Sequence, residues 1–167
     1  MERMEINMSN EMNGYSGYNE KTGIEDIIKK YRPDIEKLNK YASWLESKCG
    51  KQVCTDFEPD DANLSLKVPV YDSTLMSFIK TANETQFMNR NYVYTYSKYH
   101  IRTIEDELAF IDRAGIAELL MLGDILSKYV LKGMQKADLW PIAVREGIFF
   151  KVIDKMKKII EYWTMPL

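Results

Sequence analysis

The segment 115-GIAELLMLGDILSKYVLKG-133 decides the fold of this chain. Its apolar side chains recur at helical spacing over so wide an arc that solvent could reach little of a helix formed here. These apolar positions are Ile116, Leu119, Leu120, Leu122, Ile125, Leu126, Tyr129 and Val130. Gly133 is typical of a residue that ends a helix. We therefore expect a central, buried helix and an all-α fold around it.

Two further helices are expected after Gly133. Asp138 can cap a short helix over 139–146, in which Pro141 lies early enough to be tolerated. Gly147 then separates this helix from a final one over 148–163. The final helix has an apolar face, which consists of Ile148, Phe149, Val152, Ile153, Met156, Ile159 and Ile160. Its other side carries Lys151, Lys155, Lys157 and Lys158.

Capping signals also predict two helices shortly before the central one. Asp72 can accept a hydrogen bond from a backbone N–H in the first turn of a helix that begins near residue 73. Thr103 and Asp106 have the spacing of a capping box, in which each side chain satisfies a free N–H of the helix start. A second amphipathic helix is therefore expected from residue 104.

The N-terminal third predicts two more helices. Thr22 and Glu25 form a capping box that would open the first of them. Pro33 has no N–H to donate and restricts the residue before it, so we expect it to end this helix and begin the next. That second helix should run to about Cys49, because Gly50 is a natural stop.

The predicted fold is a single-domain mixed helical bundle of six or seven helices over residues 22–167. Residues 1–21 lack apolar periodicity and are expected to form a disordered N-terminal tail. A long irregular segment is expected near residues 50–70, where prolines and acidic residues replace the helical period. An extended tyrosine-rich linker is expected near residues 88–100.

The segment 89-NRNYVYTYSKYHIR-102 holds four of the eleven tyrosines and the only histidine. A strand-like register would place the evenly spaced tyrosines and the histidine on one side. Such a face either packs between helices or binds single-stranded nucleic acid, with bases stacked on tyrosine and phosphates held by cations. The packing interpretation is favoured. The candidate ligand residues are Arg90, Tyr92, Tyr94, Tyr96, Lys98, His100 and Arg102.

Composition and motifs narrow the classes of function. The 23 Lys and Arg against 25 Asp and Glu give a net charge of −2, which offers no electrostatic help to nucleic-acid binding. The sequence contains no phosphate loop or hydrolase motif, so no catalytic residue is predicted, and His100 as a general base is only an alternative. Cys49 and Cys54 supply too few ligands for zinc. Neither a metal nor a cofactor is expected.

The C-terminal end suggests a binding function. The chain has ten Met and three Trp, and YWTMPL follows the last lysine-bearing turn. Exposed apolar residues there, namely Trp163, Met165 and Leu167, would need a partner. We predict a non-catalytic helical binding protein for protein–protein interaction or self-association. No apolar run has the length of a signal peptide or membrane span, so we expect a cytoplasmic protein with no membrane partner.

The order of the pieces over roughly residues 68–160 resembles a family of small bacterial proteins known only as a domain of unknown function. The resemblance rests on Tyr71, Phe78, the Leu119–Leu120 pair, Glu146 and Gly147. It implies an all-helical fold and no catalytic residues. The stretch GMQKADLW before the short helix departs from the Arg-Phe pair that members tend to have there, which puts any site built on that pair in doubt.

Overall fold

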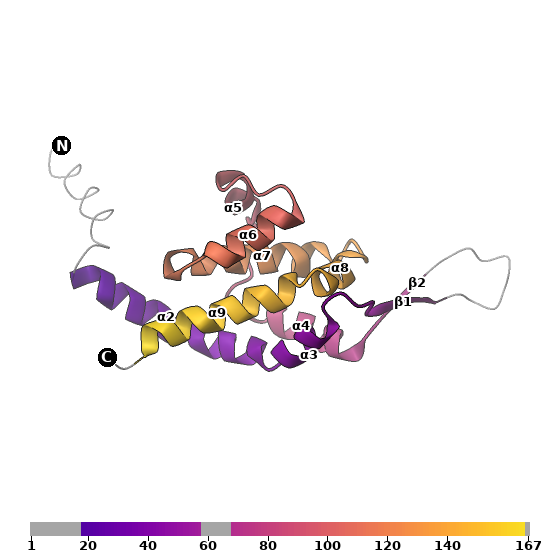
Figure 1. Cartoon of the computed structure of the whole chain (residues 1–167), viewed down its shortest axis with the longest axis horizontal. Helices are drawn as coiled ribbons and strands as arrows, with labels where there is room; N and C mark the ends of the chain where they lie inside the picture. The colour runs from indigo at the N-terminus through magenta and orange to yellow at the C-terminus, as the bar shows by residue number, and fades with distance from the viewer. Residues whose placement is uncertain (1–17, 58–67, 166–167) are drawn as a thin grey trace. The chain divides into compact units, whose positions relative to one another are not determined.

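The structure is a computed structural model that describes residues 18–57 and 68–165 (Figure 1). It confirms an all-α helical bundle. The helices are α2 (Tyr18–Asn39), α3 (Ala42–Lys48), α4 (Ser73–Asn83), α5 (Val93–Lys98), α6 (Ile104–Arg113), the 3-10 turn η1 (Ile116–Glu118), α7 (Leu119–Lys132), α8 (Leu139–Arg145) and α9 (Ile148–Thr164). The chain divides into two units, residues 1–33 and 34–167. The bundle belongs to the second unit.

Helix α7 is the centre of the bundle, as its apolar pattern predicted. Helices α4, α5, α8 and α9 pack against it, and α9 also packs against α3, α6 and α8. All seven predicted apolar residues of α9 are buried. Because helices in water gain most of their stability from packing an apolar face, these two long patterns determine the core.

The predicted caps at the start of α4 and α6 are confirmed. Asp72 Oδ1 accepts a hydrogen bond of 2.7 Å from the backbone N–H of Thr74. Thr103 Oγ1 accepts one of 3.1 Å from the N–H of Asp106, whose carboxylate accepts in return from the N–H of Thr103. Gly50 follows α3 with a φ of 76°, a left-handed conformation that suits glycine and explains why the helix stops there.

The predicted break at Pro33 was wrong. Helix α2 begins at Tyr18, within the expected tail, and continues through Pro33 to Asn39. A helix can tolerate an interior proline when tertiary contacts hold its ends. Within the second unit, Asn39 Nδ2 donates to Ile35 O at 2.9 Å and to Ile153 O of α9 at 3.1 Å. These bonds occupy a carbonyl of the last turn and fix the end of α2.

The segment near residues 50–70 is not wholly irregular. Strands β1 (Cys54–Phe57) and β2 (Val68–Tyr71) form an antiparallel pair in which Cys54 lies opposite Tyr71. Valine, threonine and aromatic residues favour strands. Pro69 is compatible with a two-stranded ribbon because each strand there is an edge. Residues 58–67 lie outside the described part of the chain.

The prediction of an extended linker over residues 88–100 was also wrong, because α5 occupies its centre. Tyr92, Tyr94, Tyr96 and His100 therefore do not form one face in a strand-like register. Helix α5 ends in a Schellman arrangement, with the N–H of Ile101 donating to Tyr96 O at 2.9 Å. His100 takes the left-handed position at this end, with a φ of 55°.

Candidate functional site

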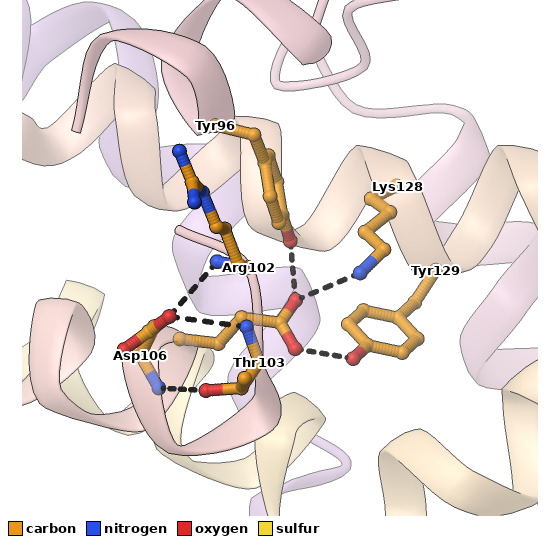
Figure 2. A network of polar contacts seen from close by, with 7 residues as sticks. Tyr96, Arg102, Thr103, Asp106, Lys128 and Tyr129 are labelled. Atoms are coloured by element: carbon orange, nitrogen blue, oxygen red, sulfur yellow. Dashed lines mark hydrogen bonds and ion pairs between the residues drawn. The ribbon is translucent and has the colours of Figure 1, made fainter. Parts of the chain in front are cut away.

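A buried carboxylate, that of Glu107 in α6, collects three donors (Figure 2). The hydroxyl of Tyr96 donates to Oε2, and the hydroxyl of Tyr129 donates to Oε1 at 2.5 Å. Lys128 Nζ lies 3.4 Å from Oε2 and about 5 Å from the centres of both tyrosine rings. Glu107 is 1% exposed, so its charge and hydrogen-bonding capacity are matched inside the protein.

The two tyrosines in this network are held in their protonated form. Burial raises the pKa of Tyr96 well above its usual value. The negative charge of Glu107, and the hydrogen bond that Tyr96 donates to it, raise this pKa further. The same causes raise the pKa of Tyr129. Each hydroxyl must keep its proton in order to donate to Glu107. The cluster is therefore suited to holding α5, α6 and α7 together and not to abstracting a proton from a substrate.

A second buried carboxylate, that of Asp124 in α7, fastens the same segment. Thr95 Oγ1 donates to Asp124 Oδ2 at 2.5 Å, and Asn89 Nδ2 donates to Oδ1 at 2.9 Å. One turn later, Ser127 Oγ accepts from the N–H of Asn89 at 2.9 Å and donates to Phe87 O at 3.0 Å. Adjacent residues of α5, Thr95 and Tyr96, thus bind carboxylates on two different helices.

Because of these hydrogen bonds, the predicted ligand residues do not all lie on one exposed surface. Tyr94 is 77% exposed, and Arg90, Lys98, His100 and Arg102 are also exposed. The hydroxyl of Tyr96 instead donates to the buried Glu107, and the ring of Tyr92 packs edge-on against the Tyr96 ring at 6.2 Å between centroids. The tyrosines therefore do not form one stacking platform. Among the residues that the structure describes, the imidazole of His100 has no hydrogen-bond partner.

The end of α9 borders a hollow of about 440 Å³. One wall consists of residues 114–118, which lead into and form η1, and the other is the last part of α9. The hollow is lined by Ala114, Gly115, Ile116, Ala117, Glu118, Lys155, Lys158, Ile159, Tyr162 and Trp163. Tyr162 and Trp163 are 70% and 43% exposed, and their rings meet edge-on at 5.4 Å. An apolar floor with exposed aromatic groups at its border is typical of a docking surface.

A second hollow of about 470 Å³ continues this surface along α9 toward α6. Lys155 and Lys158 line both hollows. Lys155 Nζ donates a hydrogen bond of 2.6 Å to Asp112 O at the end of α6, so this side chain crosses the boundary between the two hollows. Lys158 pairs with Asp154 at 2.8 Å, and this hydrogen bond raises the pKa of Lys158. The lining of the two hollows thus combines these charged groups with apolar side chains.

Part of this surface was predicted from the sequence. Trp163 and Met165 are exposed, at 43% and 69%, while Leu167 lies outside the described residues. The contribution of Ile116 was missed because its helical spacing resembled that of a core residue. Ile116 lies in the 3-10 turn η1, which interrupts the expected long helix at its start, and it lines the hollow.

Residues 18–57 and 68–165 contain no helix long and apolar enough to cross a membrane. Within the same ranges, no group of three or more His, Cys, Asp and Glu side chains could hold a metal ion. The thiol of Cys49 donates to Leu45 O at 3.4 Å, and burial raises its pKa. Cys49 is therefore poorly suited to act as a thiolate nucleophile.

No protein-family model, curated protein or solved structure matches this chain. The resemblance over residues 68–160 therefore stays a prediction. Two parts of the chain, the α5 segment and the end of α9, are the candidate functional sites.

Proposed function

We propose that this chain is a non-catalytic binding protein that docks another protein chain at the end of α9. The observation that carries the proposal is the pair of exposed aromatic side chains, Tyr162 and Trp163, beside a hollow with an apolar floor. Tryptophan and tyrosine dominate the energetics of many interfaces, because each adds a large apolar area with few rotatable bonds.

The support beneath these aromatic groups favours the proposal. The apolar face of α9 is buried from Ile148 to Ile160, and Trp163 continues this face into the last turn of the helix. A rigid helix holds its exposed side chains in place before a partner arrives, which lowers the entropy lost on binding. Met165, directly after the last residue of the helix, is 69% exposed. Methionine adapts its shape to irregular partner surfaces.

The two alternatives have less support. For an enzyme, the buried carboxylates of Glu107 and Asp124 are already occupied by donors from the fold itself. For single-stranded nucleic acid, Tyr94 remains as an exposed ring with cations nearby, while Tyr96 is turned toward Glu107. One ring offers one stacking position, whereas such sites usually stack several bases in succession.

Site-specific photocrosslinking separates these possibilities. A photoreactive amino acid replaces Tyr162 in one version of the full chain and Tyr94 in a matched control; the two native residues are 70% and 77% exposed. Irradiation in cells that make the native protein should attach a protein to position 162 and none to position 94. Trp163→Ala should remove the adduct at 162 if the hollow is the docking site.

Two outcomes would overturn the proposal. One is an adduct of nucleic acid at position 94 with none at 162. The other is a protein adduct at 162 that Trp163→Ala leaves unchanged, because the contact would then not involve the hollow.

A further inference from the structure

We infer that the partner at the end of α9 is a second copy of this chain, related to the first by a two-fold axis. The Tyr162–Trp163 end of each copy would enter the hollow of the other. This inference rests on the proposed function, because it names the protein that docks there. The carrying observation is that the aromatic pair and the hollow belong to the same face.

A two-fold contact uses the same patch on both subunits, so the patch must be complementary to itself. The surface at the end of α9 meets this condition in shape. Tyr162 and Trp163 are exposed at the border of a hollow whose lining includes Ile159, Ile116 and Ala117. A rotated copy offers a projecting aromatic pair to each hollow and a hollow to each pair.

The charged residues that line the hollow are also complementary to themselves. Glu118 lies on the η1 wall, and Lys155 and Lys158 lie on the α9 wall, where Lys158 also pairs with Asp154 of its own helix at 2.8 Å. A partner whose charges were all acidic would meet Glu118, and one whose charges were all basic would meet Lys158. A copy rotated by 180° instead brings Lys158 toward Glu118 of the other copy, and does so twice. Opposite charges that face each other select the partner and its orientation.

The size of the surface predicts a weak, reversible dimer. Each large aromatic side chain can bury about 150–250 Å², and a stable interface buries about 800 Å² per partner. Tyr162 and Trp163 alone fall short of that area, although the second hollow along α9 enlarges the face. We therefore expect a dissociation constant on the order of micromolar.

Sedimentation of the full chain over a range of concentrations tests the inference. The mass should rise from 19.6 kDa at high dilution toward twice that value. Trp163→Ala should raise the dissociation constant by about tenfold or more, as truncation of a central aromatic group commonly does. Tyr94→Ala removes a ring of α5 that is 77% exposed, against 43% for Trp163, and should leave the association unchanged.

A mixing experiment tests the two-fold axis itself. Glu118→Lys alone places two lysines together at both contacts, and Lys158→Glu alone places two glutamates together, so each variant should be monomeric. An equimolar mixture should associate. In the mixed dimer the new lysine faces the new glutamate at one contact, and Lys158 faces Glu118 at the other. Because Glu118 also accepts from the N–H of Gly115 at 3.0 Å, thermal unfolding must show that both variants are folded.

The outcomes separate this inference from the proposed function. A monomer at all concentrations that still gives a Trp163-dependent protein adduct at position 162 would overturn the second copy and leave the docking surface intact. A monomer without an adduct would overturn both. A dimer unaffected by Trp163→Ala would place self-association elsewhere, and two monomeric variants that stay monomeric when mixed would overturn the pairing of Glu118 with Lys158.

Discussion

The segment around α5 and the end of α9 both concentrate aromatic residues, but they use them in opposite ways. Tyr96 and its neighbour Thr95 turn inward and donate to the buried carboxylates of Glu107 and Asp124. Tyr162 and Trp163 stay exposed beside a hollow. An aromatic-rich sequence therefore indicates a binding surface only where the rings are not already packed or hydrogen-bonded within the fold.

The largest effect is expected from removing the carboxylate that anchors α5. Glu107→Ala leaves the hydroxyls of Tyr96 and Tyr129 and the ammonium of Lys128 without their acceptor. Breaking a buried charged pair from one side should lower the free energy of unfolding by about 3–5 kcal/mol, measured by urea denaturation. Glu105→Ala, an exposed change in the same helix, should cost less than about 1 kcal/mol. If the two variants lower the free energy of unfolding by the same amount, the network does not stabilise the fold.

Alkaline pH should weaken the same network. The pKa values of Tyr96 and Tyr129 are raised above 10.0, so the folded chain keeps protons that the unfolded chain releases. The resulting stabilisation is fully present below about pH 10 and is lost as the pH rises further, at up to about 1.4 kcal/mol per pH unit for each tyrosine. Urea denaturation at about pH 9, 10 and 11 measures this slope. Tyr96→Phe should reduce it by about half, and an unchanged slope would contradict the assignment.

A smaller effect of the opposite sign is expected at the end of α5. His100 adopts a φ of 55°, a conformation that is strained for residues with a Cβ and natural for glycine. His100→Gly should therefore stabilise the protein by about 0.5–1 kcal/mol, whereas His100→Ala should change little. Thermal unfolding of both variants measures the difference. Destabilisation by glycine would indicate an extended segment in place of a helix that ends at His100.

The smallest effect on stability is expected at the end of α9. Trp163 is 43% exposed, so Trp163→Ala should change the free energy of unfolding of the dilute monomer by less than about 0.5 kcal/mol. Trp140 is only 6% exposed and provides the comparison. Trp140→Ala should cost about 3–5 kcal/mol. Equal costs at the two positions would mean that Trp163 belongs to the core and is not free to dock a partner.

Long apolar patterns and caps made most of the bundle predictable. Helices α7 and α9 have 14 and 17 residues, enough for a 3.6-residue period to stand out. Asp72 and Thr103 fixed the starts of α4 and α6, since the partners of a cap lie within one turn of the same helix. In these cases the deciding residues are neighbours in the sequence.

The predictions of local structure were wrong where residues distant in the sequence determine that structure. Helix α5 has only six residues, too few to be stable alone, and its partners Glu107 and Asp124 lie 11 and 29 positions beyond Tyr96 and Thr95. The continuation of α2 through Pro33 likewise overrides a local signal. At the candidate site, Trp163 and Met165 could be predicted from their place after the last apolar turn. The hollow could not, because its second wall comes from residues 114–118.

The most direct test of self-association through the end of α9 is sedimentation equilibrium of three full-length proteins side by side: the native chain, Trp163→Ala and Tyr94→Ala. The native chain and Tyr94→Ala should show the same rise in mass with concentration, while Trp163→Ala stays near 19.6 kDa over that range. Loss of association in Tyr94→Ala, with Trp163→Ala behaving as the native chain, would contradict the account and move the binding surface from the end of α9 to α5.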